Sequence, residues 1–210
     1  MRWLLEQLTE PELEVVDLAW MKRELREFSE VTSRDDDIEE KIKSAREWIE
    51  QYTGRVLVDS TWRVSIERTG DMFTDYTVPA KSLYGTTMPV RDVYLRRSPV
   101  LAITSVVTVD GNGEETAVSE DDYLLQDTDG KWPLVIPIGT GTWGAANTRI
   151  TFRAGFANRT GSPVDGVDVV PGRFKQAMIL WVKWNYDGDP ANLTAAEAIA
   201  RPLRVNLGIA

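Results

Sequence analysis

The feature that most constrains this chain is a change of apolar periodicity that happens twice. Apolar residues repeat every three or four positions from about 17 to 53, alternate in short runs from 55 to 155, and return to the longer period after 171. Spacings of three and four line one face of a helix, whereas alternation lines one face of a strand. The sequence therefore predicts an α+β fold in which helices flank a central β region.

Two helices are predicted before the β region. The first covers residues 17 to 28, has Asp17 as its N-cap and carries an apolar stripe of Leu18, Met21, Leu25 and Phe28. The second covers residues 36 to 53, with a stripe of Ile38, Ile42, Ala45, Ile49 and Tyr52. Gly54 follows it, as expected for a helix end that needs positive φ. We expect both helices to pack into one bundle.

The middle of the chain consists of short alternating runs. Trp62, Val64 and Ile66 take one face of the first strand, with polar residues between them. Similar runs follow at 93–95, 103–109, 123–125, 132–136 and 149–152. Residues 110–113, Asp-Gly-Asn-Gly, predict a hairpin turn because Asn and Gly tolerate positive φ. These runs predict a mainly antiparallel sheet or a small barrel.

A third helix is predicted from 171 to 187, since Pro171 is favoured in a first helical turn and Pro190 follows its end. A short Ala-rich turn at 194–200 comes next. Beyond Pro202 the apolar residues alternate again, at Leu203, Val205, Leu207 and Ile209. Two interpretations stay open: this segment is an edge strand of the chain's own sheet, or it adds as a strand to a neighbouring protein.

These patterns divide the chain into five parts. We expect an N-terminal arm at 1–16, a helical part of the bundle at 17–54, an inserted β domain at 55–155, a return loop with the third bundle helix at 156–190, and a C-terminal tail at 191–210. No run of about 20 apolar residues exists, and the first residues lack the features of a signal peptide. The sequence therefore predicts a protein that stays in the cytoplasm where it is made and does not enter a membrane.

Composition excludes several classes of function. The chain has no cysteine and no histidine, which rules out disulfides, thiolate zinc sites, cysteine nucleophiles and the Ser-His-Asp triad. Its formal net charge of -9 repels phosphate, so sequence-independent nucleic-acid binding is disfavoured. The same acidity suits a channel wall past which DNA slides without sticking. We expect no catalytic residue, no metal and no cofactor.

Acidic and glycine-rich motifs all have simpler structural explanations. Asp127, Asp129 and Gly130 resemble the start of a calcium loop, but its twelfth position is Ile138 instead of an acid. The segment 110–114 fails in the same way, because Glu115 stands where glycine is needed. Turns between strands explain both segments. The run 139–144 lacks the Gly-Lys-Ser/Thr ending of a phosphate loop, and no helix is predicted after it.

Two further groups of residues are also explained by structure. Asp35, Asp36 and Asp37 precede a helix, where its dipole and free N–H groups favour carboxylates, and Asp36 with Glu39 has the spacing of a capping box. The three aromatic residues of the last helix, Trp181, Trp184 and Tyr186, are typical of a core, although such rings also stack on bases or sugars.

The order of these signals resembles that of the phage head-tail connector family, the adaptors also called head-completion proteins. The resemblance is carried by 18–26, 35–38 with 46–55, 97–111, and 150–155 with 170–186, and it includes the short motif Tyr52, Thr53, Gly54 and Arg55. It implies a small helical bundle with an inserted mainly antiparallel β domain and an extended C-terminal tail. The long loops 69–91 and 137–147 and the N-terminal arm depart from the family pattern.

The resemblance also implies a function in the virion neck. Subunits would form a dodecameric ring beneath the portal protein, with DNA passing through the centre without sequence-specific binding. A stopper or tail terminator protein would dock on the lower face. The tail residues that would face the portal are Leu203, Arg204, Val205, Asn206, Leu207 and Ile209.

Two other functions are compatible with the sequence. A β-sandwich-type binding module for a carbohydrate or cell surface would expose Trp132 and Trp143 on one face. An enzyme that uses carboxylates alone would need paired acids inside a deep pocket.

Overall fold

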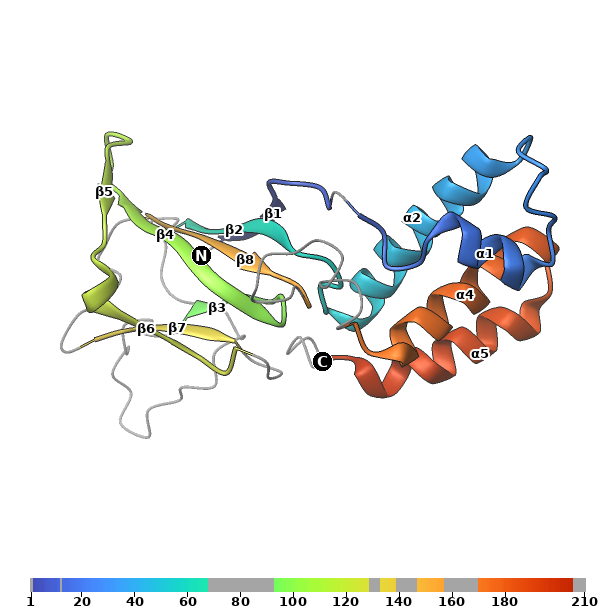
Figure 1. Ribbon diagram of the computed structural model, residues 1–210. Coiled ribbons are helices and arrows are strands. Elements are labelled where there is room, and N and C mark those ends of the chain that lie inside the picture. Colours follow the sequence, from blue (N-terminus) through green and yellow to red (C-terminus); the bar gives the residue numbers. More distant parts are fainter. Residues whose placement is uncertain are drawn as a thin grey trace. The chain divides into compact units, whose positions relative to one another are not determined.

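The computed structural model describes residues 2–11, 13–67, 93–128, 133–138, 147–156 and 170–205. Within these residues the chain forms two compact units. One contains residues 2–10 with the described part of Ser60–Ala154, and the other contains the described parts of Pro11–Asp59 and Gly155–Val205. The second unit is helical and the first is built from antiparallel strands, so the predicted α+β class is confirmed (Figure 1).

The helical unit is a bundle whose elements are α1 (Leu18–Leu25), α2 (Asp35–Thr53), α4 (Gly172–Asp187), α5 (Pro190–Ala200) and the short 3₁₀ turn η2 (Arg201–Leu203). The apolar stripes predicted from the sequence meet in its core. Ile38, Ile42 and Ile49 of α2 are fully buried with Phe174, Met178 and Val182 of α4. Burial of each large aliphatic side chain stabilises the bundle by about 1.5–3 kcal/mol.

Helix α1 begins as predicted but ends early. The Asp17 carboxylate accepts the N–H of Trp20 at 2.6 Å, so its role as N-cap is confirmed. At the other end Arg26 adopts φ 60°, and its N–H closes the helix on carbonyls of the last turn. Phe28 was predicted on the apolar stripe, but it lies beyond this stop and is 75% exposed.

Helix α2 starts one residue earlier than predicted. Arg34 takes the N-cap position and makes no side-chain capping bond, so the predicted capping box of Asp36 and Glu39 is wrong. All three acids, Asp35, Asp36 and Asp37, lie in the first turn, where the helix dipole favours negative charge. Gly54 ends the helix at φ 71°, as predicted.

The segment after α4 is more regular than the sequence indicated. Residues 190–200 form the complete helix α5, whereas only an Ala-rich turn was predicted there and 191–210 was assigned to the tail. Asp189 caps this helix by accepting the N–H of Ala191 at 2.9 Å, and Pro190 occupies the first turn. The buried Ala196 and Ala200 on one face explain how this Ala-rich stretch packs on α4.

The β unit contains a five-stranded and a three-stranded antiparallel sheet among the described residues. The larger sheet has the order β1-β2-β8-β4-β5 and the smaller one β3-β7-β6. The strands are β1 (Arg2–Gln7), β2 (Ser60–Glu67), β3 (Val93–Tyr94), β4 (Val100–Val109), β5 (Glu115–Ala117), β6 (Tyr123–Gln126), β7 (Leu134–Pro137) and β8 (Asn147–Ala154). The turn η1 (Glu120–Asp122) precedes β6. Figure 1 shows the two sheets as separate layers of this unit.

The prediction of an N-terminal arm at 1–16 is wrong for residues 2–7. Residues 2–7 form the edge strand β1, which pairs along its whole length with β2, from Arg2↔Glu67 to Gln7↔Trp62. The partner lies about sixty residues away in the sequence, so no local pattern signals the pairing. The N-terminal residues therefore belong to the larger sheet.

The buried face of the larger sheet follows from its register. Trp62 pairs with Phe152 and Val64 with Ile150, and all four side chains are buried. The alternation predicted for β2 is confirmed by its regular succession of buried and half-buried residues. Side chains on the opposite face, including Arg63 and Arg153, are only partly buried or exposed.

Gly155 is required where the chain returns to the bundle. Its φ is +143°, and an added Cβ would lie 2.6 Å from the backbone nitrogen of Asp59 and from the backbone carbon of Val58. Neither backbone atom moves cheaply. Phe156 follows, and its N–H donates to the carbonyl of Leu57 at 3.3 Å. The conformation and the close approach together explain why the sequence has glycine here.

Candidate interaction site

The base of the C-terminal tail is fixed to the end of α2. The Val205 N–H donates to the Thr53 carbonyl at 2.8 Å, and the Val205 side chain is 4% exposed. Leu203 lies in η2 and packs against the bundle core. Thr53 is itself held by a hydrogen bond from its hydroxyl to the Ile49 carbonyl at 2.6 Å. The chain therefore leaves the bundle at a defined point.

Tyr52 forms the other side of this tail base. The guanidinium carbon of Arg204 lies 5.0 Å from the centroid of its ring, a distance at which the cation is attracted to the ring face. Tyr52 and Thr53 belong to the short motif, residues 52–55, that is one part of the family resemblance. Their contacts with Arg204 and Val205 give these two residues a structural role, because the tail begins on them.

A strip of aromatic side chains continues from Tyr52 across α2 and α4. The rings stack in the order Tyr52, Trp48, Trp181 and Trp184, with centroid separations of 5.4, 6.2 and 5.7 Å. All four are half-buried, so the prediction that the tryptophans of α4 belong to a core is only partly correct. Tyr186 lies apart from the strip and receives a hydrogen bond from Arg34.

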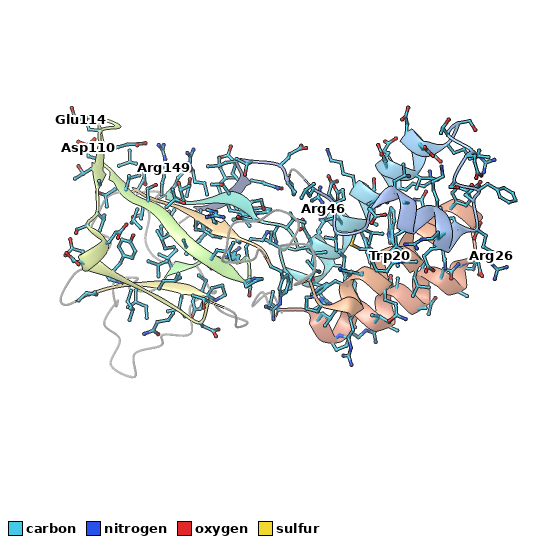
Figure 2. The ribbon with its side chains drawn as sticks, in the orientation of Figure 1. Trp20, Arg26, Arg46, Asp110, Glu114 and Arg149 are labelled. Carbon is cyan, nitrogen blue, oxygen red and sulfur yellow. The ribbon has the colours of Figure 1, made fainter. Side chains whose placement is uncertain are left out.

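A buried arginine organises the chain on the opposite side of α2. Arg46 is 2% exposed, and its Nε donates to Glu14 at 2.9 Å while a terminal nitrogen donates to Glu50 at 3.3 Å. Burial alone lowers the pKa of Arg46, but the hydrogen bond and charge of Glu14 with the charge of Glu50 outweigh it, so the pKa is raised. Glu50 also accepts the N–H of Leu57 at 2.7 Å. Arg46, labelled on α2 in Figure 2, thus connects the segment before α1, through Glu14, to Glu50, which holds the segment after α2.

Lys22 plays a similar role for the loop between α1 and α2. Lys22 is 5% exposed. Its ammonium group donates to the carbonyls of Ser29 and Val31 at 3.2 and 2.6 Å and to the Asp35 carboxylate at 2.7 Å. Three oxygen partners satisfy the three donors of a buried ammonium. The loop that exposes Phe28 is therefore built around one side chain.

The proposed portal-facing residues are divided by the structure. Leu203, Arg204 and Val205 lie together at the tail base, where they contact the bundle of their own chain. Asn206, Leu207 and Ile209 lie outside the described residues. The portal-binding role of the tail stays a prediction.

The acidic turn at Asp110 is a hairpin, as predicted. Its carboxylate accepts the N–H groups of Glu114 and Asn112 at 2.9 and 2.8 Å, and these bonds lower the pKa of Asp110. Figure 2 shows Asp110 and Glu114 together at the tip that joins β4 and β5. Within the described ranges, no group of three or more acids has the arrangement of a metal site.

Several other sequence motifs cannot be placed. Asp127 has φ 53°, as in a turn, while Asp129 and Gly130 lie outside the described residues. The glycine-rich run 139–144 and both Trp132 and Trp143 also lie outside them. The alternative of a carbohydrate-binding face therefore stays a prediction.

Sequence reasoning missed the two buried cations, Arg46 and Lys22. A partial signal existed for Arg46, because Glu50 stands four residues later on the same helix. Nothing local pointed to Glu14, which is 32 residues away. In the part of the chain that the structure describes, no helix has the length and hydropathy needed to cross a membrane.

Comparison with known proteins finds solved structures with the same fold. No family model and no curated protein matches the sequence. A chain in the neck of an empty gene transfer agent (GTA) particle, computed with C6 symmetry, superposes with a TM-score of 0.72 at 19% sequence identity, over 96% of this chain and 95% of that chain. The two chains have the same fold.

Two further structures agree. A chain of the virion of the native GTA particle gives a TM-score of 0.70 at 19% identity, and one in the neck of the native particle, computed with C12 symmetry, gives 0.68 at 20%. Both alignments again cover 96% of this chain and 95% of the other. The shared fold thus includes both the bundle and the β unit.

Proposed function

We propose that the chain is a structural head-tail connector, or adaptor, subunit of a tailed phage or phage-like particle. Copies form a dodecameric ring under the portal protein, extend the DNA channel and receive the next neck or tail component. The observation that carries this proposal is the fold shared with chains of GTA necks over 96% of the sequence. The role is structural and needs neither catalysis nor a cofactor.

Two parts of the tail have different roles in this proposal. Leu203 and Val205 anchor it to the bundle, so they contribute to the chain's own stability. Residues 206, 207 and 209 continue from that anchor toward the portal. Because Val205 is fixed at the Thr53 carbonyl, every copy in a ring directs its tail from an equivalent position. DNA passes through the ring, and the acidic chain does not retain it.

The test is deletion of residues 206–210 in particles that contain the full chain. The deletion stops short of Val205, since losing Leu203 and Val205 would also remove buried apolar contacts of the bundle. We expect the truncated protein to unfold at the same temperature as the wild type and to be absent from the neck. Electron microscopy of wild-type particles should show the chain as a ring at one capsid vertex.

The control is Val205→Ala, which weakens the anchor and keeps the terminal residues. It should lower stability by about 1–3 kcal/mol while the protein still reaches the neck. Absence of the wild-type chain from the vertex contradicts the proposed function. Normal incorporation of the truncated chain contradicts only the role given to the tail.

A further inference from the structure

Phe28 is the most exposed large apolar side chain among the described residues, with 75% of its surface accessible to solvent. It lies in the loop between α1 and α2, where the Val31 N–H donates to the Phe28 carbonyl at 3.1 Å and closes a turn. Val31 is exposed as well, at 40%. We call residues 28–31 the Phe28 turn. Aromatic side chains are enriched at the centres of protein interfaces, so this turn is a candidate contact.

A single exposed apolar side chain needs no explanation by itself, but this one sits on a turn that a buried lysine holds. The Lys22 ammonium donates to two carbonyls of the turn, those of Ser29 and Val31, and to the Asp35 carboxylate. Removing a charged group from water is costly even when all its hydrogen bonds are made. Here that cost fixes a turn whose apolar side chains stay exposed. An ordered turn loses less entropy on binding, so the Phe28 turn is preorganised for a partner.

The Phe28 turn and the tail base lie at opposite ends of α2. The turn precedes the first residue of this helix, Asp35, whereas the carbonyl that holds Val205 belongs to its last residue, Thr53. The 19 residues of α2 place these ends about 28 Å apart. Arg26, labelled in Figure 2, marks the end that carries the turn. A contact made at the tail base is therefore separate from one made at the Phe28 turn.

Acidic side chains predominate at the end of the bundle that carries the turn. Arg34 donates to the Tyr186 hydroxyl, which brings the end of α4 beside the start of α2. Four ion pairs balance part of the charge here: Glu24–Lys183, Glu27–Arg34, Asp35–Lys22 and Asp37–Lys41. The other charged residues of 23–40 and 184–189 are two cations and six acids, all exposed: Arg23, Arg26, Glu30, Asp36, Glu39, Glu40, Asp187 and Asp189. This end of the bundle is therefore negative.

The position of Asp187 indicates that these acids do more than cap helices. The positive N-terminal ends of α2 and α5 favour Asp36 and Asp189. Asp187 is instead the last residue of α4, where the helix dipole disfavours an acid, and the last turn of α4 contains no basic residue. An acid at this position costs stability. The exposed acids around the turn therefore favour a partner that carries positive charge.

A second copy of this chain fits that description poorly. The chain has a formal net charge of -9. The exposed arginines Arg173, Arg201 and Arg204 lie at the tail-base end of the bundle, which the proposed function assigns to the portal. The arginines of the larger sheet have acids beside them, as Arg149 has Glu115. The charges thus favour a different, basic protein as the partner.

We infer that the Phe28 turn is the anchor for the next neck component, a protein distinct from the portal whose docking face has an apolar pocket bordered by basic side chains. The inference rests on the proposed function, because only a ring beneath the portal has a next component. Phe28 enters the pocket, and the surrounding acids meet its basic border. One aromatic side chain buries about 150–250 Å², far less than a standard interface, so the contact gains its strength from repetition around the ring.

Phe28→Ser tests the anchor in complete particles that contain the full chain. Because the side chain is exposed, the variant should unfold at the same temperature as the wild type and still occupy the neck. We expect the fraction of particles with density beyond the ring of this chain, counted by electron microscopy, to fall at least about tenfold, as for loss of a hot-spot residue. The matched control is Leu13→Ser, at an apolar residue of the helical unit that is 41% exposed. It should leave that fraction unchanged.

Substitutions at the acids test the charge of the partner. Glu30→Lys combined with Asp187→Lys should lower the same fraction. The control is Asp121→Lys combined with Asp122→Lys, which makes an equal change of charge on η1 in the β unit and should have no effect. Equal losses for both pairs would show that only the overall charge matters, and would overturn the assignment of a basic border.

Lys22→Met tests whether the turn must be held in place. The variant keeps Phe28 but loses the hydrogen bonds to the turn, so attachment of the next component should fall. Circular dichroism checks that the variant is folded. When Lys22→Met is combined with Phe28→Ser, the loss should be no larger than for Phe28→Ser alone, because no anchor is left to position. Losses that add would mean that Lys22 acts only through stability.

A photoreactive analogue of phenylalanine at position 28 identifies the protein that the turn contacts. Benzoylphenylalanine is incorporated at this position in whole particles, which are irradiated and analysed by peptide mass spectrometry. We expect a cross-link to a polypeptide other than this chain and the portal. A cross-link to a second copy, to the same chain or to the portal would overturn the inference.

Failure of this inference is distinguishable from failure of the proposed function. If the wild-type chain is absent from the capsid vertex, the proposed function fails. If the wild-type chain is present there and Phe28→Ser particles carry the next component as often as the wild type, the proposed function stands and this anchor is wrong.

Discussion

The two units hold their irregular segments in different ways. In the bundle, buried charged side chains do this: Lys22 fixes the loop after α1, and Arg46 fixes the segment that contains Glu14. The buried polar residues described in the β unit are uncharged, namely Ser60, Ser98 and Thr148. There, backbone pairing aligns the segments, as where Val100 N–H donates to the Thr128 carbonyl at 2.8 Å. The bundle therefore depends more on single side chains than the β unit does.

The largest effect expected from this difference is that of Arg46→Met. It removes the arginine that pairs with Glu50, whose side chain is 9% exposed, and breaking a buried pair from one side costs about 3–5 kcal/mol. Urea unfolding followed by the helix signal measures the change. The control Lys41→Met removes the exposed pair with Asp37 and should cost less than about 0.5 kcal/mol. A loss below about 1 kcal/mol for Arg46→Met would mean that packing alone fixes the segment.

Matched cavity variants compare the two cores. Ile49 in the bundle and Ile150 in the larger sheet are both fully buried, so Ile49→Ala and Ile150→Ala should each cost about 2–5 kcal/mol. Calorimetry decides whether the units unfold together. Independent units give two transitions, of which each variant lowers only its own. A single transition lowered equally by both variants would show that the units are thermodynamically one.

The smallest effect is expected at the β4–β5 turn. The lowered pKa of Asp110 means that its carboxylate stabilises the turn at neutral pH and that this support is lost as the pH falls through the lowered pKa. Asp110→Ala should speed amide exchange at Asn112 and Glu114 and leave global unfolding unchanged. Exchange in the wild type should show an acid-dependent step at these two amides, and the variant should lack it. A fall in global stability would contradict the local role.

Much of the architecture was predictable because its signals are local. The stripes of α2 and α4, the alternation of β2 and the turn at Asp110 each depend on residues within one element. The same holds for Asp17, whose cap bond joins residues three apart.

The wrong predictions concern contacts between residues far apart in the sequence, or a backbone conformation that the residue type does not indicate. Strand β1 exists because β2 pairs with it, and Arg46 is buried because Glu14 reaches it. Helix α1 ends because Arg26 adopts a positive φ. Arginine rarely adopts this conformation, so the sequence does not indicate the helix end there. At the tail, alternation was visible, but the sequence did not show that Leu203 and Val205 belong to the bundle.

The aromatic strip has an optical consequence. Trp48, Trp181 and Trp184 lie in ring contact, so their electronic transitions couple and excitation passes among them. Coupled indoles give an exciton circular dichroism signal in the far ultraviolet that is lost when the rings separate. Because the strip joins α2 to α4, the chain carries its own label-free reporter of whether those two helices are docked.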